Sequence, residues 1–377
     1  MKASDFFELI EQDLKEGKAM VSYRLPDKDA VQLLSQTSRG VFRIKDFSES
    51  GFIFAPFENS ENPLFIPEND CAKTVLPFFE KAIFQLSTTE NSSENFNAEE
   101  KSAHINLVGL GIETILKTEL QKVVLSRKEI QKVTASAAEI FKNLLSLYPN
   151  AFVYLWSHPE TGVWIGATPE TLLRTERTKF STMSLAGTRM RQDFSENNWT
   201  QKEIMEQQIV TDSIVSKLND LGYSEAVLNV SETFTSEAGS LLHLRTDITG
   251  NFKMDTTEIG SILKSLHPTP AICGLPTKVA REFILNHENY DREFYTGYLG
   301  LINMTTEIKR SNRTRNQENQ AYSSIRKDSA LFVNLRCLKY TEGEVAIYVG
   351  GGITKDSEPS LEWEETVSKT RTMKAAL

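Results

Sequence analysis

The residues best placed to do chemistry follow a run of three glycines near the end of the chain. Gly350–Gly352 end an apolar, strand-like run, a polar turn with Pro359 follows, and a helix-like run then begins. In that run Glu362, Glu365 and Lys369 are three and four residues apart, so they share one helical face. A bare backbone facing two carboxylates and an ammonium group could hold a small anion and a metal ion. The alternative is a strand, a glycine turn and a solvated helix with a Glu365–Lys369 ion pair.

A second pair of glutamates with helical spacing lies at Glu203 and Glu206. Thr200 and Glu203 match the T-x-x-E pattern of a capping box, which predicts that a helix begins there. The apolar stripe of residues 210–221, extended backwards, includes both glutamates. Capping accounts for Glu203. A carboxylate at the end of a buried stripe is costly unless it is paired or bound to a metal, so Glu206 is the better candidate ligand.

Carboxylates from two helices, with no histidine or cysteine beside them, favour a hard metal ion. Mg²⁺ is usually bound through one or two carboxylates together with substrate and water oxygens. Such an ion could connect an acidic site to a carboxylate of a substrate. Spacing alone does not bring the two helices together, so each glutamate could also be a solvated side chain.

Three further residues could complete a catalytic site. Lys122 lies on a segment that alternates as a strand, Glu170 in a turn with proline, and Arg336 in LFVNLRCLKY, which predicts one more strand. A lysine and a glutamate on opposite sides of a substrate could act as general base and general acid. An arginine could bind a carboxylate through two hydrogen bonds. Each could equally be an ordinary structural side chain.

The elements that must position these residues indicate an α+β fold. FVYLW and VWIGA, separated by SHPETG, predict a hairpin, and residues 171–188 predict two more antiparallel strands. Helices are expected at 104–120, at 134–147 and from residue 200 onward. Hairpins with helices between them predict antiparallel sheets wrapped by helices around a cleft, rather than a doubly wound parallel sheet.

The N-terminal part carries no recognisable chemistry. Residues 1–85 predict an amphipathic helix and short strands, and the polar stretch 87–101 predicts a loop or linker. We therefore expect residues 1–100 to form an N-terminal part and 101–377 the catalytic part of one integrated unit. The basic segment 309–328 is expected to be a long exposed loop.

Composition excludes several classes of function. Hydrophobic content of 40% and charged content of 25% are ordinary for a soluble globular protein, and a net charge of −9 argues against a general nucleic-acid or anionic-membrane binder. Three cysteines make neither a disulfide framework nor a zinc site, which favours a reducing cytoplasm. The sequence has no signal-peptide pattern and no apolar run of about 18 residues. Because no exposed apolar repeat calls for a partner, we expect a monomer.

Nine segments follow one another between Lys122 and Lys369, over roughly two-thirds of the chain: KVVLSR, GATPE, SLAGTR, the K-E-x-x-E helix, HLRTDITG, LHPTPAICGLP, FYTGYLG, LFVNLRC and GGGI with the later EWEE. In this order they resemble the chorismate-utilising enzymes. That family contains isochorismate synthases, salicylate synthases, anthranilate synthase large subunits and aminodeoxychorismate synthases.

Three positions distinguish the members of this family. Members that use ammonia typically have glutamine where this chain has Lys122, and aminodeoxychorismate synthases have a nucleophilic lysine in place of Ala186. Salicylate synthases tend to have threonine in place of Ala271. The resemblance therefore implies an isochorismate synthase, which adds water at C2 of chorismate and removes the C4 hydroxyl. Alternatives are a salicylate synthase, an anthranilate-type aminotransferring enzyme, or a catalytically silent paralogue that only binds chorismate or a protein.

The resemblance also implies a role for each site residue. Lys122, as a neutral amine, takes a proton from the attacking water, and Glu170 protonates the departing hydroxyl. Mg²⁺ is held by Glu206 and Glu365 with support from Glu203 and Glu362. No glutaminase partner is expected, and the product would serve menaquinone or siderophore biosynthesis. The substrate is expected to contact Gly187, Thr188, His243, Ala271, Tyr295, Arg336, Gly350 and Lys369.

Overall fold

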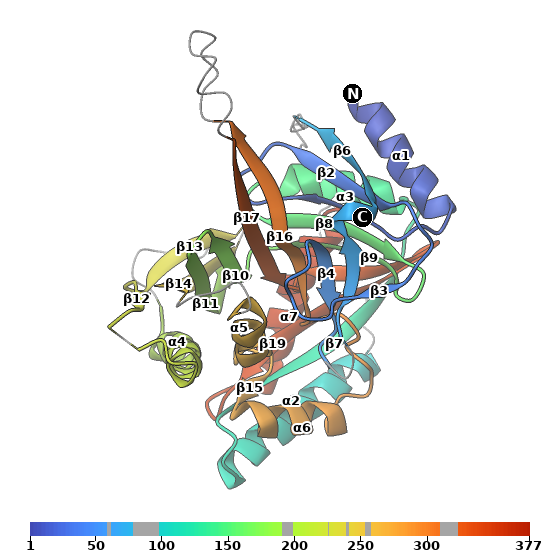
Figure 1. The fold of residues 1–377 in the computed structure, drawn as a ribbon. Coiled ribbons are helices and arrows are strands. Elements are labelled where there is room, and N and C mark those ends of the chain that lie inside the picture. Colours follow the sequence, from blue (N-terminus) through green and yellow to red (C-terminus); the bar gives the residue numbers. More distant parts are fainter. Residues whose placement is uncertain are drawn as a thin grey trace.

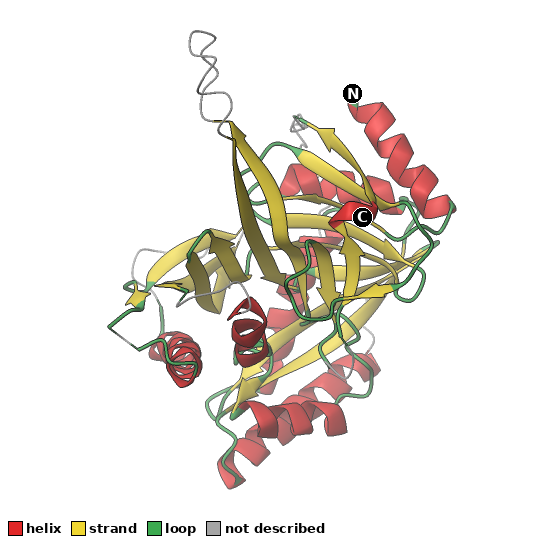
Figure 2. Cartoon of the chain, in the orientation of Figure 1, coloured by secondary structure: helices red, strands yellow, loops and turns green. Residues whose placement is uncertain are grey.

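The chain folds around two large antiparallel sheets with helices on their outer sides, as the computed structural model shows (Figures 1 and 2). The predicted α+β class with antiparallel sheets is therefore confirmed. The structure describes residues 1–58, 62–77, 98–190, 199–224, 226–238, 241–252, 258–309 and 323–377.

One sheet has nine strands and mixes segments from both ends of the chain. In spatial order the strands are β15 (Gly274–Leu275), β7 (Lys122–Lys132), β19 (Glu344–Ile353), β18 (Cys337–Thr341), β9 (Gly162–Thr168), β8 (Phe152–His158), β1 (Met20–Arg24), β2 (Val31–Gln36) and β6 (Cys71–Leu76). Because β1 pairs with β8 and β19 pairs with β7, segments that are distant in the sequence form one continuous hydrogen-bonded layer.

The other sheet has ten strands. Along its main path, in spatial order, lie β12 (Asn229–Val230), β14 (Leu241–Asn251), β11 (Lys179–Met190), β10 (Thr171–Glu176), β17 (Ser323–Val333), β16 (Tyr298–Lys309), β4 (Gly51–Ala55), β5 (Leu64–Pro67) and β3 (Phe42–Arg43). Beside this path β13 (Phe234–Ala238) pairs with β14. The predicted hairpin of β8 and β9 and the predicted antiparallel pair of β10 and β11 are both confirmed by their registers.

The helices cover the outer faces of the sheets. The predicted capping box is present at the start of α4: the Thr200 side chain accepts from the Glu203 N–H, and Glu203 accepts from the Thr200 N–H. None of the described helices is both long enough and apolar enough to cross a membrane. The helices are α1 (Ala3–Lys15), α2 (Ala98–Lys117), α3 (Ala137–Leu147), α4 (Gln201–Asp220), α5 (Glu258–Leu266), α6 (Thr277–His287) and α7 (Pro359–Lys374), with a 3₁₀ turn at Glu68–Asp70.

Four apolar clusters hold these layers together. An aromatic cluster joins the two sheets: the rings of Phe152 on β8 and Phe332 on β17 stack with centroids 4.2 Å apart. Other clusters bury α4 and α5 against the ten-stranded sheet and α1 and α3 against the nine-stranded one. A fourth packs α2 and α6 onto Val123 and Leu125 of β7, and Figure 1 shows both helices beneath that strand. Because side chains alternate along a strand, Lys122 and Val124 are directed to the opposite face.

Two of the places where the chain passes from one sheet to the other lie next to each other. Between β9 and β10 it crosses through Glu170, and between β17 and β18 it crosses through Arg336. The crossings are bonded to each other, because the N–H of Val333 donates to the carbonyl of Glu170 and the N–H of Ala167 to that of Arg336. The prediction that LFVNLRCLKY forms one strand is wrong: it breaks at residues 334–336, where Arg336 has a φ of 47°.

Two boundaries predicted from polarity are also wrong. The helix expected at 104–120 is α2, which begins at Ala98 inside the stretch assigned to a linker. The segment 309–328, expected to be a loop, contains the end of β16 at Lys309 and the first part of β17 from Ser323. The rest of both predicted stretches, residues 87–97 and 310–322, lies outside the described residues. Acidic residues such as Glu99 and Glu100 are favourable in the first turn of a helix, and charged residues are tolerated on strands open to solvent, so polarity misplaced both boundaries.

Candidate active site

A cavity of about 290 Å³ gathers nearly all the residues singled out from the sequence. It lies where the two sheet crossings, the glycines of β19 and the helices α4 and α7 meet. Glu362 does not line it but lies directly behind Gly351, and the side chain of Thr188 on β11 is not described. The predicted residues that line the cavity are Lys122, Glu170, Gly187, Glu203, Glu206, His243, Ala271, Tyr295, Arg336, Gly350, Glu365 and Lys369.

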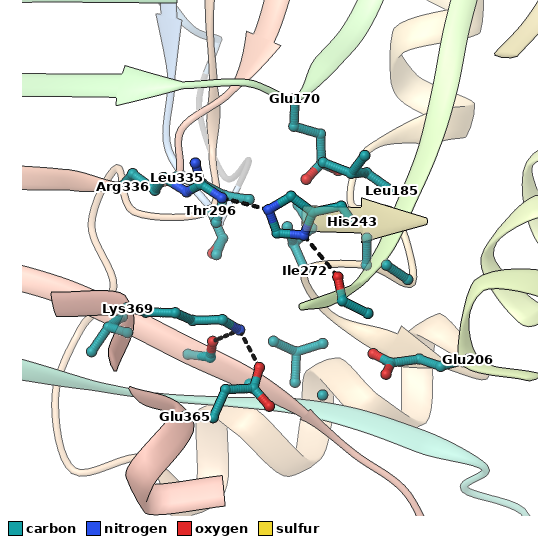
Figure 3. Close-up of a pocket in the computed structure, with 18 of the residues that line it drawn as sticks. Glu170, Leu185, Glu206, His243, Ile272, Thr296, Leu335, Arg336, Glu365 and Lys369 are labelled. Atoms are coloured by element: carbon teal, nitrogen blue, oxygen red, sulfur yellow. Dashed lines mark hydrogen bonds and ion pairs between the residues drawn. The ribbon is translucent and has the colours of Figure 1, made fainter. Parts of the chain in front are cut away.

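The charged side chains are arranged on two walls. Figure 3 shows Glu170, Arg336 and His243 along one wall and Glu206, Glu365 and Lys369 along the opposite one. A molecule in the cavity would therefore contact a carboxyl group and a guanidinium from one side and carboxylates with an ammonium from the other.

Glu170 is a buried carboxyl group placed by the first sheet crossing. It is 5% exposed, and burial raises its pKa to about 7, although the positive charges of Lys122 and Arg336 act in the opposite direction. Desolvation disfavours the carboxylate more than these cations favour it. Glu170 therefore carries a proton in a substantial fraction of molecules near neutral pH, which is the property that a general acid requires.

Arg336 and His243 are bonded in a way that defines the tautomer of the histidine. Arg336 Nη2 lies 2.6 Å from His243 Nε2, and His243 Nδ1 lies 2.7 Å from the carbonyl oxygen of Gly187. A guanidinium can only donate, so Nε2 accepts and the proton lies on Nδ1, where it is donated to Gly187. Burial, followed by the charge of Arg336, lowers the pKa of His243 to about 3, which keeps the ring neutral. His243 thus holds the arginine without adding a second charge.

Lys122 and Glu206 form an ion pair on the opposite wall. Lys122 Nζ lies 2.8 Å from Glu206 Oε1, and the lysine side chain is 1% exposed. Gly352 makes room for this pair: a Cβ atom there would lie 2.5 Å from Glu206 Oε1 and 2.9 Å from Lys122 Cε. The third glycine of the run is therefore needed for close approach rather than for a turn.

Lys369 and Glu365 form a second ion pair, one helical turn apart on α7. Lys369 Nζ lies 2.6 Å from Glu365 Oε1 and donates to the carbonyl of Gly350 at 2.9 Å. A Cβ atom at Gly351 would lie 3.4 Å from an oxygen of Glu362 and 4.0 Å from Glu365 Oε1. The shared helical face predicted for these three side chains is thus turned toward the glycine run.

Both carboxylate oxygens of Glu203 already accept hydrogen bonds from neighbouring residues. Arg189 donates to both of its carboxylate oxygens at 2.7 Å, and the backbone N–H and hydroxyl of Thr200 donate to one of them. The Arg189 guanidinium also lies over the ring of Trp199. A role for Glu203 in metal binding stays a prediction, and it would require this arrangement to open.

The donor chemistry of Glu206, Glu362 and Glu365 suits Mg²⁺, since all three are carboxylates. They approach two adjacent glycines from two helices, Glu362 and Glu365 at Gly351 and Glu206 at Gly352. The described part of the chain contains no ready-made cluster of three His, Cys, Asp or Glu side chains that could hold a metal ion. Two of the carboxylates have lysine partners instead. Glu206, Glu362 and Glu365 are therefore the residues that could hold Mg²⁺.

Gln207, beside Glu206, is the centre of a buried polar cluster. Its Nε2 lies 2.9 Å from Ser184 Oγ, 3.0 Å from Thr211 Oγ1 and 2.7 Å from Thr246 Oγ1. These partners belong to β11, α4 and β14, so the amide fixes α4 against the sheet. Gln207 is therefore well accommodated, and it supports the position of the adjacent Glu206.

Sequence reasoning missed several residues of the cavity wall. Met373 lies one helical turn beyond Lys369, so helical spacing alone could have identified it. Arg189 follows the SLAGT segment directly and could have been found as its extension. Thr296 could not, because it reaches the wall through a left-handed backbone conformation with a φ of 60°.

Comparison with known proteins identifies close resemblances over most of the chain. A family model described as chorismate binding enzyme matches residues 70–309, and a second model of the same description matches 321–375. The isochorismate synthase DhbC of Bacillus subtilis is 28% identical over 56% of this chain and 50% of its own length. The vibriobactin-specific isochorismate synthase of Vibrio cholerae is 30% identical over 68% of this chain and 62% of its own.

The match thus covers 50% of the length of the first relative and 62% of the length of the second, which is less than two thirds in both cases. Among solved structures, MenF, the menaquinone-specific isochorismate synthase of Escherichia coli, has a TM-score of 0.71 at 21% identity. That superposition covers 95% of this chain and 88% of the other, so the two proteins have the same fold.

Proposed function

Because the chain belongs to the chorismate-binding enzyme family, we propose that it converts chorismate to isochorismate. The reaction adds water at ring carbon C2 and removes the hydroxyl group from C4. Two curated relatives with this activity, at 28% and 30% identity, support the proposal, and the chemistry of the cavity supports it independently.

One observation carries the proposal: a buried carboxyl group with a pKa of about 7 shares a cavity with a buried lysine. Exchange of a hydroxyl group between two ring carbons needs an acid at the departing oxygen and a base at the attacking one. Glu170 is the acid and Lys122 is the base. Lys122 begins β7 and Glu170 lies in the crossing between β9 and β10, so the two reach the cavity from different walls, as a displacement across a ring requires.

The proton movements follow from these two side chains. The protonated carboxyl of Glu170 donates its proton to the C4 oxygen, the C4–O bond breaks, and the oxygen leaves as water. Lys122 Nζ, which acts as a base only once it has given up its own proton, accepts a proton from the water whose oxygen bonds to C2. After one turnover Glu170 has lost one proton and Lys122 has gained one, and a proton returned from lysine to glutamate, directly or through solvent, restores the starting state.

The cations of the cavity neutralise the two carboxylates of chorismate. Arg336, oriented by His243, is suited to the enolpyruvyl carboxylate, since a planar guanidinium can donate two parallel hydrogen bonds. Lys369 adds a second positive charge on the opposite wall. Mg²⁺ held by Glu206 and Glu365, with Glu362 behind them, would supply positive charge for the ring carboxylate. In an acidic protein such local cations are what makes a dianionic substrate acceptable.

Product analysis of the purified protein tests this proposal. The protein is incubated with chorismate and Mg²⁺, with and without a chelator, and the products are separated and identified. Isochorismate formed only with the metal is the expected result. Salicylate with pyruvate would instead indicate a salicylate synthase, and an amino product formed with ammonium an anthranilate-type enzyme. Chorismate that binds without being consumed would identify a catalytically silent member of the family.

A further inference from the structure

Two residues of the cavity wall have strained backbones. Arg336 has a φ of 47° and Thr296 a φ of 60°, and both line the cavity. Residues other than glycine rarely adopt positive φ, and for a β-branched residue such as threonine it is a clear outlier. Such conformations persist only where the surrounding structure determines them. Something in this fold must therefore hold both residues.

Asn334 is the residue that contacts both strained segments. It lies two positions before Arg336, is 0% exposed, and does not itself line the cavity. Its backbone N–H donates to the carbonyl of Gly297 at 2.8 Å, and its carbonyl accepts from the N–H of Thr296 at 2.9 Å. The backbone of Asn334 thus pairs the sheet crossing with the segment that precedes β16.

The side chain of Asn334 completes the connection. The hydroxyl of Tyr154 on β8 donates to its Oδ1 at 2.5 Å, and its Nδ2 donates to the carbonyl of Phe294 at 2.8 Å. Tyr154 can serve as donor and the Phe294 carbonyl only as acceptor, so the position needs one acceptor and one donor on a short side chain. Aspartate lacks the donor and leucine lacks both groups. The side-chain amide of asparagine provides both the acceptor and the donor that this position needs.

The contacts of Asn334 also flank Tyr295, another residue that lines the cavity. Tyr295 lies between Phe294 and Thr296, both bonded to Asn334, and its hydroxyl would lie 3.1 Å from a Cβ atom at Gly350. Arg336 follows Asn334 on the other side. One buried residue is thus bonded next to both the guanidinium of Arg336 and the phenol of Tyr295, which line the cavity.

We propose that Asn334 is a positioning residue for substrate binding, acting through Arg336 and through the segment of Tyr295 and Thr296. The inference rests on the proposed function for the identity of the substrate. It predicts that loss of the Asn334 amide weakens chorismate binding, because the arginine and tyrosine remain present but leave their productive positions.

A matched pair of variants separates positioning from general stability. Asn303 is also buried, at 3% exposed, and its Nδ2 donates to two backbone carbonyls, at 2.7 and 2.9 Å, but it does not line the cavity. Asn334→Ala and Asn303→Ala should both lower the melting temperature. Only Asn334→Ala should raise the KM for chorismate, by about ten-fold or more, as expected when a binding group is displaced. Equal KM values in both variants would overturn the proposal.

A double-mutant cycle tests whether Asn334 acts through Arg336. In an Arg336→Ala background, Asn334→Ala should reduce kcat/KM by clearly less than it does in the wild-type background, since its main effect is transmitted by the arginine. Fully additive losses would contradict the inference. If the wild-type protein consumes no chorismate, the proposed function fails. The affinities of the two asparagine variants for chorismate, measured by calorimetry, then decide the positioning role separately.

Discussion

Lys122 Nζ and Glu206 Oε1 lie 2.8 Å apart, although the lysine begins β7 and the glutamate lies on α4. The proposed base therefore shares a hydrogen bond with a proposed metal ligand. An amine that donates its proton to a carboxylate is not free to accept one. Whether Glu206 accepts this hydrogen bond therefore affects whether Lys122 can act as the base. This contact couples the base to the proposed metal site, and it can be probed from either partner.

Replacing Lys122 with glutamine should abolish water addition. The introduced amide can still donate to Glu206 but cannot accept a proton from water, so we expect isochorismate formation to fall by at least about 10²-fold. The assay is product formation from chorismate with Mg²⁺ present. At high ammonium concentration the variant could form an aminated product. That result would show that the residue at position 122 determines whether water or ammonia is the nucleophile. A rate within about two-fold of wild type would contradict the assignment of the base.

Gly352→Ala should disturb the same contact without removing a functional group. The new methyl would lie 2.5 Å from Glu206 Oε1, closer than nonbonded atoms allow, so the ion pair must shift. We expect kcat/KM to fall by about ten-fold or more, because small displacements at a catalytic group are costly. Gly109→Ala on α2 is the control, since its added Cβ meets no atom within 4 Å and alanine favours a helix. Equal activities of the two variants would show that the close approach at Gly352 is unimportant.

The activity should decline as pH rises through about 7. Burial raises the pKa of Glu170 in the free protein to about 7, and the general acid must be protonated to act, so kcat/KM is lost as the carboxyl ionises. Glu170→Gln should reduce kcat by about 10²- to 10⁴-fold while chorismate still binds. It should also remove this alkaline limb from the residual activity. Profiles of kcat/KM between about pH 5.5 and 9, measured for both proteins, check the assignment; an unchanged limb in the variant would assign it to another group.

Local patterns predicted the parts of this site that depend on local geometry. Strand alternation directed Lys122 to one face of β7, the T-x-x-E pattern identified the start of α4, and helical spacing put Glu365 and Lys369 on one face. Each prediction depends on residues within about one turn or one strand, where backbone geometry fixes side-chain direction.

The rest depends on contacts between distant segments. The sequence around Arg336 alternates well enough to predict one strand, although the strand breaks there. The cause of the break is the set of hydrogen bonds that Asn334 forms with Phe294, Thr296 and Gly297, which the local sequence does not reveal. Likewise, nothing near Glu170 in the sequence indicates that its carboxyl group is desolvated. Left-handed backbone at non-glycine residues and shifted pKa values arise from tertiary packing, which sequence spacing does not contain.

Glu170 should also reduce the stability of the folded protein at neutral and alkaline pH. Between pH 4.5 and about 7 the unfolded chain has lost this proton while the folded protein, with its raised pKa, keeps it, so raising the pH favours unfolding. The loss amounts to about 3 kcal/mol once the pH is above both values. Glu170→Gln should therefore gain stability over wild type at pH 8 but not at pH 4. Urea unfolding at both pH values measures this difference, and an equal effect at both would contradict it.

Glu365→Ala should remove the dependence on Mg²⁺ together with the activity. Glu365 is a proposed metal ligand and the partner of Lys369, so its loss removes a carboxylate from the wall and frees an ammonium group beside Gly350. We expect turnover to fall by at least about 10²-fold and Mg²⁺ titration to restore none of it. Glu364→Ala is the matched control, because that neighbouring carboxylate on α7 is exposed to solvent and does not line the cavity. Direct Mg²⁺ binding, measured by calorimetry, should be weakened in the first variant only. Unchanged Mg²⁺ affinity in Glu365→Ala would remove this carboxylate from the metal site, whatever happens to the rate.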